Sequence, residues 1–137
     1  DAAPTPHPWL GDAALADEFA RRRKQAGHLV SKMRFLAAPW IATLEGGRWL
    51  AHAAHANAMA RRLSAALVRV PGTRLVAPTE ANGVFVDLPK RTIDGLRERG
   101  WRFYVFVGET GCRFMCAWDT RVEDVDRLAG DVAALVA

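Results

Sequence analysis

The residue whose type and position most clearly suggest a chemical role is Arg113, which interrupts an otherwise apolar run with the pattern of a β-strand. Alternation along a strand places Arg113 on the face opposite to Cys112 and Cys116. An unpaired buried guanidinium is costly, so this side chain requires an anionic partner. Two partners remain open: a structural carboxylate, Asp119 or Asp87, or the carboxylate of a bound ligand held by the planar guanidinium fork.

The cysteines and histidines do not predict a metal site. Cys112 and Cys116 lie four residues apart, which is the wrong spacing for a zinc knuckle, and same-face positions on one strand are too far apart for a disulfide. We expect two reduced thiols in the core of a cytoplasmic protein. His52 and His55 have the spacing of a chelating pair on a helix, but no third ligand falls at a suitable helical position, so packing or surface roles are favoured.

The basic run Arg21 to Lys24 is also open to a simple interpretation. Four consecutive helical positions wrap around the helix, which favours a solvated helix end over a binding stripe. A formal net charge of +4 permits phosphates or carboxylates as ligands without requiring nucleic acid. No aromatic platform or groove-reading helix accompanies the run, so a nucleic-acid-binding protein is the weakest of the functional alternatives.

The composition bounds the class of protein. The 137 residues, 50% hydrophobic and 25% charged, are enough for one globular core. We expect no membrane partner, because no apolar run approaches the ~18–20 residues that span a bilayer. The first ten residues hold three prolines and lack the pattern of a signal peptide.

The first half of the chain predicts helices. Asp12 can cap a helix that Gly27 weakens or breaks, and an apolar helical stripe then runs from Leu29 to Pro39. A long amphipathic helix is predicted over Arg48 to Val68 and is ended by a Pro-Gly pair. The face predicted to be apolar consists of Trp49, Ala53, Ala56, Met59, Leu63 and Leu67.

The second half changes to the two-residue period of strands. The predicted order is strand, strand, helix, strand, strand, helix, in the segments "TRLVAP", "NGVFVDLP", Thr92–Arg99, "WRFYVFV", "CRFMCAW" and the residues after Thr120. The turn "GETG" joins the last two strands as a hairpin, and residues 120–123 match a capping box. The fold class predicted from this order is α+β, an antiparallel sheet with helices packed on one face.

Four segments together carry a resemblance to a known family. These segments are "RRRKQAGHLVSKMRFLAAPW", "HANAMARRL", "EANGVFVDLP" and "CRFMCAWDT" followed by "EDVDRL". Similar segments occur in the same order and with similar spacing in the pyridoxal-phosphate-dependent threonine aldolases. The chain resembles the low-specificity bacterial branch of this family, within the β-eliminating lyases of fold type I. The likeness runs from about Asp12 to the C-terminus and corresponds to roughly the last third of a family member.

The resemblance implies a fold and an activity. It divides the chain into a non-matching lead-in (1–11), linking helices (12–70) and a small α+β C-terminal domain (71–137). Family members cleave L-threonine or L-allo-threonine to glycine and acetaldehyde, with pyridoxal 5'-phosphate as electron acceptor. The lysine that binds the cofactor covalently lies upstream in the family, so we expect a fragment that has no catalytic residue and is inactive alone.

The resemblance also implies site residues and partners. Arg113 falls at the position that holds the substrate α-carboxylate, while Lys32, and next to it Arg34, falls where a basic residue contacts the cofactor phosphate. An amino-acid substrate and a homo-oligomer, dimer or tetramer, follow from the family. Apolar surface is expected to be exposed around Phe35, Leu36, Trp40 and Ile41. The alternative is a non-catalytic oligomerisation or binding module that retains the small-domain fold.

Overall fold

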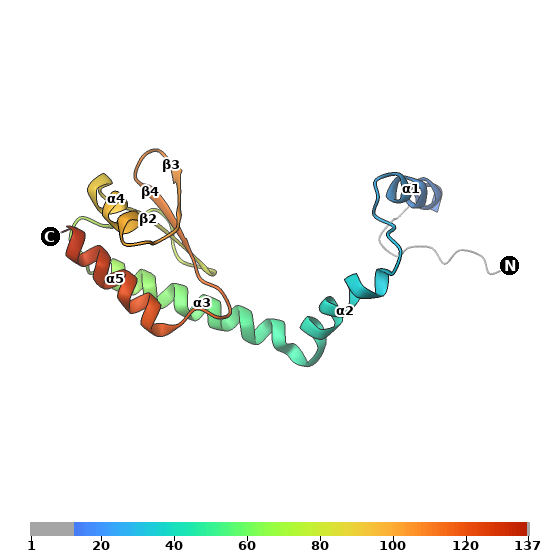
Figure 1. The fold of residues 1–137 in the computed structure, drawn as a ribbon, viewed down its shortest axis with the longest axis horizontal. Coiled ribbons are helices and arrows are strands. Elements are labelled where there is room, and N and C mark those ends of the chain that lie inside the picture. The colour runs from blue at the N-terminus through green and yellow to red at the C-terminus, as the bar shows by residue number, and fades with distance from the viewer. Residues whose placement is uncertain (1–12, 137) are drawn as a thin grey trace. The chain divides into compact units, whose positions relative to one another are not determined.

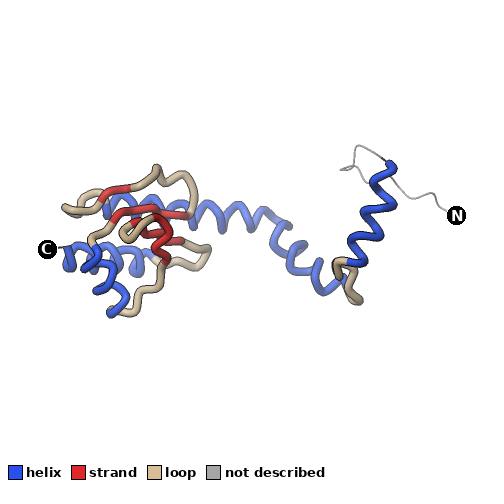
Figure 2. The backbone as a smooth tube through the Cα atoms, turned by 90° about the horizontal axis from the view of Figure 1, so that it is seen from above, coloured by secondary structure: helices blue, strands red, loops and turns tan. Residues whose placement is uncertain are grey.

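The computed structural model describes residues 13–136, which form two compact units, one ending at Glu45 and the other beginning at Gly46 (Figure 1). The first unit holds α1 (Ala13–Gln25) and α2 (Met33–Leu44). A single 3-10 turn, η1 (Glu45–Gly47), follows α2. Within the described residues, strands occur only in the second unit (Figure 2).

The helices of the first unit confirm part of the prediction. Gly27 follows the end of α1 with φ at +73°, a conformation that suits glycine, so the predicted break lies there. Asp12, the predicted N-cap of α1, lies outside the described residues. The prediction that the next helix ends at Pro39 is wrong, because α2 continues through Pro39 to Leu44. The helix is exposed, so water can donate a hydrogen bond to the backbone carbonyl of Phe35, which receives none from the proline.

The second unit begins with α3 (Arg48–Leu67). This helix starts at the predicted residue and ends one residue before the predicted end at Val68. Only part of the predicted apolar face is buried. Ala56, Leu63 and Leu67 are buried, whereas Trp49 at the start of the helix is 46% exposed. The C-terminal part of α3 therefore belongs to the core of this unit.

A four-stranded antiparallel sheet follows, with the strand order β1-β2-β4-β3. Its elements along the chain are β1 (Arg74–Leu75), β2 (Gly83–Asp87), α4 (Lys90–Glu98), β3 (Tyr104–Val107), β4 (Gly111–Met115) and α5 (Val122–Val136). This is the predicted order of strands and helices, and the predicted hairpin is formed by β3 and β4. The fold class, α+β with a small antiparallel sheet, is confirmed.

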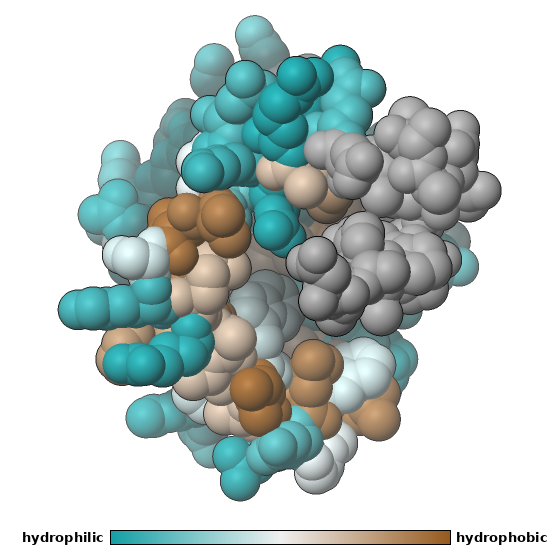
Figure 3. Space-filling view, turned by 90° about the vertical axis from the view of Figure 1, so that its right-hand side faces the viewer, coloured by the Kyte–Doolittle hydropathy of each residue, from teal (hydrophilic) through white to brown (hydrophobic). Residues whose placement is uncertain are grey.

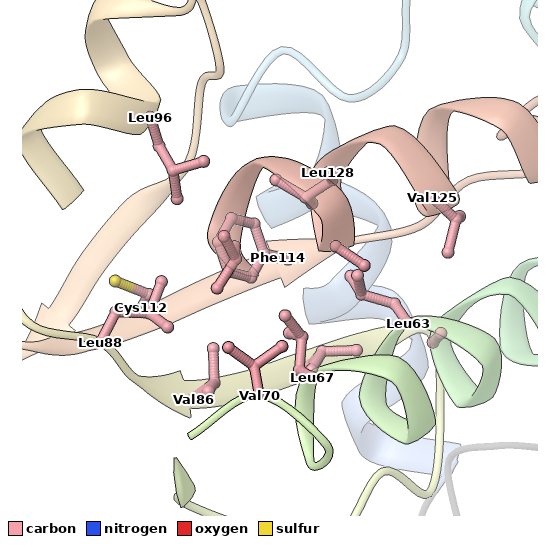
Figure 4. Close-up of a cluster of buried hydrophobic side chains, with 14 of the residues drawn as sticks. Leu63, Leu67, Val70, Val86, Leu88, Leu96, Cys112, Phe114, Val125 and Leu128 are labelled. Atoms are coloured by element: carbon pink, nitrogen blue, oxygen red, sulfur yellow. The ribbon is translucent and has the colours of Figure 1, made fainter. Parts of the chain in front are cut away.

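One face of the sheet and the three helices α3, α4 and α5 enclose the core (Figure 4). Cys112 and Phe114 of β4, and Cys116 just after this strand, are buried in the core, as the strand alternation predicts. The largest fully buried side chains are Leu63, Leu67, Leu88, Leu96, Val84, Val86, Val132, Thr92 and Cys112. The opposite face of the sheet carries Arg113 and Met115, which is 55% exposed.

The start of α5 differs from its prediction in one detail. The helix forms where the capping box predicts it, but the Thr120 hydroxyl accepts a hydrogen bond from the backbone N–H of Ala117, at 2.7 Å. Thr120 therefore fixes the turn before the helix. The assignment of residues 12–70 as linking helices and 71–137 as a small domain stays a prediction.

Candidate functional site

The open face of the sheet places three side chains in one row. Antiparallel register pairs Arg113 of β4 with Phe85 of β2 on one side and with Tyr104 of β3 on the other. Because directly opposed residues in adjacent strands share a face, all three belong to the side that the helices leave uncovered. Arg113 therefore stands in the centre of this row, between two aromatic neighbours.

Arg113 has an aromatic neighbour but no carboxylate partner within the described residues. Its guanidinium carbon lies 5.2 Å from the centre of the Tyr104 ring. Its Nε atom is buried and has no hydrogen-bond partner among the described residues. Asp87, one of the two structural partners considered, instead pairs with Arg74, and in the described part of the chain neither Asp87 nor Asp119 forms an ion pair with Arg113. A bound anion is the other partner that the sequence leaves open.

A hollow beside Arg113 offers room for such an anion. It has a volume of about 260 Å³ and is lined by Arg102, Phe103, Tyr104, Arg113 and Met115. Its lining holds two guanidinium groups and no acidic side chain, so its electrostatic preference is for negative charge. A small carboxylate can be held there by the bidentate fork of Arg113.

A larger hollow of about 440 Å³ lies beside α5, with Asp119, Asp124 and Arg127 in its lining. Asp124 accepts a hydrogen bond from Arg127 at 2.9 Å, so these two opposite charges are paired with each other. The guanidinium of Arg127 also lies 4.9 Å from the centre of the Trp101 ring. Two of the charges that line the larger hollow thus neutralise each other, whereas the lining of the smaller hollow carries positive charge alone.

The two residues predicted for the cofactor phosphate, Lys32 and Arg34, lie in the first unit. Both are exposed, and neither forms an ion pair in the described part of the chain. Lys32 precedes α2 in the left-handed conformation, with φ at +62°, which is uncommon for a non-glycine residue. The Arg34 guanidinium lies 5.1 Å from the centre of the Phe35 ring. Arg113 belongs to the second unit, so the residues predicted for the phosphate and the residue predicted for the carboxylate lie in different units.

The remaining candidates have structural roles. His55 Nε2 lies 2.8 Å from the backbone oxygen of Thr120, and the ring of His52 packs against Trp118 with 5.3 Å between centres. The described residues contain no cluster of three metal-binding side chains. Cys112 and Cys116 are free and buried, and burial raises the pKa of the Cys112 thiol to about 11. A thiol in this state is a poor nucleophile at neutral pH.

Sequence reasoning missed Tyr104. The run "WRFYVFV" shows alternation, but the β3–β4 ladder shifts register between Val105 and Val107, so alternation alone does not decide which aromatic residue lies beside Arg113. The signal that finds Tyr104 is the hairpin register counted back from Arg113. That count is reliable only once the irregular position is known.

Comparisons with known proteins confirm the resemblance stated from the sequence. The chain is 52% identical to a low specificity L-threonine aldolase of a Pseudomonas species over 122 residues, which are 89% of this chain and 35% of that enzyme. It is 56% identical to the low specificity L-threonine aldolase of Pseudomonas aeruginosa over 118 residues, 86% of this chain and 34% of the enzyme. The chain thus spans about a third of the length of these curated relatives. No protein-family model matches it.

Solved structures agree with these relatives. The threonine aldolase of Leishmania major superposes with a TM-score of 0.76 at 25% identity, covering 93% of this chain and 36% of that one. A glycine decarboxylase, the P-protein of the glycine cleavage system, superposes with a TM-score of 0.59 at 28% identity, covering 72% of this chain and 24% of that one. Similarity in sequence and in fold therefore both point to threonine aldolases.

Proposed function

We propose that the chain forms the C-terminal part of a pyridoxal-phosphate-dependent threonine aldolase that cleaves L-threonine or L-allo-threonine to glycine and acetaldehyde. The similarity to two enzymes of that name supports this activity, and the chain spans about a third of their length. The observation that carries the proposal is Arg113, a cation on an open sheet face whose guanidinium is partly buried and has no carboxylate partner among residues 13–136.

In this proposal Arg113 binds the α-carboxylate of the amino acid. Two N–H groups of the guanidinium donate to the two carboxylate oxygens, which fixes the orientation of the amino acid. Arg102, which lines the same hollow, adds positive charge that favours binding of an anion. These contacts orient the Cα–Cβ bond that breaks.

Pyridoxal phosphate, when bound, withdraws electrons from the amino acid as this bond breaks. Lys32 and Arg34 fit its phosphate group, because they are cationic, exposed and without anionic partners in the described part of the chain. We assign no catalytic residue to the 137-residue chain and expect it to release no glycine from L-threonine by itself. The complete protein would be a homo-oligomer. The two free thiols in the described part of this chain would fit a reducing cytoplasm.

A chimera tests the role of Arg113. The part of the Pseudomonas aeruginosa relative that precedes the matched region is joined to this chain, and cleavage of L-threonine is measured. Arg113→Ala is expected to raise KM by ~10- to 100-fold with the cofactor still bound, since a charged hydrogen-bonded pair contributes ~1.5–3 kcal/mol. Arg113→Lys should recover only part of this, because a point charge does not reproduce the planar fork.

Two results would contradict the proposal. If the chimera folds and binds the cofactor but cleaves no L-threonine, the activity is wrongly assigned. If Arg113→Ala leaves KM and kcat unchanged but lowers the melting temperature, Arg113 has a structural role only.

One observation favours the second candidate function, a non-catalytic association module. No residue of α2 is buried, although the helix carries Phe35, Leu36, Trp40 and Ile41. Self-association of the 137-residue chain, together with an inactive chimera, would favour the association module over the enzyme.

A further inference from the structure

Tyr104 stands beside Arg113 on the open face of the sheet, and the sequence does not assign it a role. We propose that Tyr104 is a positioning residue for the carboxylate-binding arginine. Its ring holds the guanidinium of Arg113 at the hollow that the two residues line together. The inference deepens the proposed function and depends on it for the identity of the anion.

The backbone brings the two side chains together. Tyr104 and Arg113 are directly opposed in the antiparallel β3–β4 ladder, so both project from the same face. The Arg113 guanidinium carbon lies 5.2 Å from the centre of the Tyr104 ring, within the range of a cation–π contact. A guanidinium is weakly hydrated and planar, and therefore stacks on aromatic rings more readily than an ammonium group does.

Burial at Arg113 shows which part of its guanidinium remains for a ligand. The Nε atom is buried and has no partner in the described part of the chain, so this inner edge of the guanidinium does not face solvent. The terminal nitrogens are left as the available donors. The hollow of about 260 Å³ that Arg113 and Tyr104 share is the space into which a carboxylate can enter.

The position of Tyr104 argues against a purely structural role. Its side chain is 67% exposed, so it adds little to the buried core that α3, α4 and α5 form with the other face of the sheet. An arginine in the middle of an open strand face loses considerable rotamer freedom when it binds a ligand. A ring that already restricts the guanidinium lowers this cost, which is the general basis of preorganisation.

The same face provides a matched control. Phe106, on the same strand as Tyr104, is 46% exposed, and its ring contacts that of Phe85 with 5.1 Å between centres. Phe106→Leu removes a different aromatic contact on this face and leaves both Tyr104 and Phe85 beside Arg113 in place. A general effect of weakening this face would appear in both variants, whereas positioning of Arg113 would be lost only in a Tyr104 variant.

The first experiment observes Arg113 directly in the 137-residue chain labelled with 15N-arginine. The Nε–Hε signal of Arg113 is identified by its loss in Arg113→Lys. Tyr104→Leu is expected to shift this signal, because the ring current is removed, and to accelerate its exchange with water about five-fold or more. Tyr104→Phe, which keeps the ring, should retain the signal, and Phe106→Leu should not change it. If Tyr104→Leu does not fold, Tyr104→Thr, which suits a strand, replaces it.

The second experiment measures the consequence for substrate in the chimera. Tyr104→Leu should raise KM for L-threonine about three- to ten-fold with little change in kcat, and Tyr104→Phe should restore KM. In the Arg113→Ala background, Tyr104→Leu should have no further effect, because the tyrosine acts through the arginine.

The outcomes separate the two proposals. An unchanged Arg113 signal in Tyr104→Leu overturns the positioning role, whatever the chimera does. If the Arg113 signal of the 137-residue chain depends on Tyr104 but the KM of the chimera is insensitive to Arg113→Ala, the contact between the two side chains is retained. The proposed function of Arg113 is then overturned. A Tyr104→Leu effect that persists in full without Arg113 also overturns the positioning role.

Discussion

The helices α2 and α5 are both rich in apolar side chains, but only α5 buries them. In α5, Val125, Leu128 and Val132 are at most 7% exposed because they pack against the sheet and the neighbouring helices. In α2 no residue is buried, and Phe35 and Trp40 are 63% and 67% exposed. Apolar sequence alone therefore does not tell where a helix finds its partner.

The difference separates the two units of the chain. Gly46–Ala137 supplies a core whose layers come from its own sheet and helices. The first unit leaves its large apolar residues at the surface: Phe19, Leu29, Val30, Met33, Phe35, Leu36, Trp40, Ile41 and Leu44 are all at least 44% exposed. The face that Figure 3 shows has hydrophobic residues at the surface among hydrophilic ones. Exposed apolar patches of this kind typically mark an interaction surface.

The largest expected effect is a loss of stability on truncating the core of the second unit. Leu67→Ala, at a position with no exposed surface, should lower the free energy of unfolding by ~2–5 kcal/mol, because it leaves a cavity in the core. Trp40→Ala in α2 removes a larger side chain but should change the free energy of unfolding by less than about 0.5 kcal/mol. Urea titrations at low protein concentration measure both. A Trp40→Ala effect as large as that of Leu67→Ala would show that α2 is packed within the folded monomer.

The second prediction concerns thiol reactivity. The pKa of Cys112 is raised to about 11, chiefly by burial, whereas an exposed cysteine titrates near 8.5. Since the thiolate is the reactive form, Cys112 should react with a thiol reagent at pH 7.5 at least ~100-fold more slowly than a cysteine introduced by Ala37→Cys in the exposed helix α2. Its rate should rise with pH up to about 11. Equal rates in the folded protein would mean that the second unit opens readily.

The elements of the second unit were largely predictable from the sequence, and the reason lies in their packing. The alternation of Cys112, Arg113 and Phe114 matches two faces of a real sheet, one against helices and one open. In the first unit the same reasoning ended a helix at Pro39, because no burial pattern is present there to reveal the helix on both sides of the proline.

The candidate site was predictable to a smaller extent. Strand alternation identified Arg113, since a charge within an apolar strand requires an explanation. It could not exclude Asp87 as partner, because the pairing of Asp87 with Arg74 depends on which strands are neighbours. The roles of Lys32 and Arg34 stay predictions.

The third prediction concerns association through the first unit. If α2 is an interaction surface, the 137-residue chain should self-associate, and the double variant Phe35→Ser, Trp40→Ser should weaken association by about ten-fold or more, as loss of aromatic anchors does. Met115→Ser is a control at a 55% exposed position on the sheet. Sedimentation at several concentrations measures the effect. A clean monomer at high concentration, or a larger effect of Met115→Ser, would count against α2 as the surface.

The smallest expected effect concerns acid, and it applies to the second unit. The carboxylate of Asp131 in α5 accepts hydrogen bonds from Trp101 Nε1, at 2.7 Å, and from Arg99. The hydrogen bond from Trp101 is the main reason that the pKa of Asp131 is lowered. A carboxyl group with a lowered pKa in the folded state adds stability above its unfolded pKa, near 3.9, and this stability is lost as pH falls below that value.

Asp131→Asn should therefore lower the free energy of unfolding at pH 7, and the difference from the wild type should shrink as pH falls from about 5 toward 2. We expect a loss of less than about 1 kcal/mol in the free energy of unfolding at pH 7, because the side chain of Asp131 is still 23% exposed.

The control, Glu18→Gln, removes the pair of Glu18 with Arg22 in α1, where the two side chains are 42% and 73% exposed. This pair joins two turns of one exposed helix, so its loss should leave the unfolding of the second unit unchanged at every pH. A difference between Asp131→Asn and the wild type that stays constant with pH would show that the hydrogen bond from Trp101 does not favour the charged carboxylate. A comparable effect of Glu18→Gln would instead show that α1 unfolds together with the packed core, which would remove the distinction between the two units.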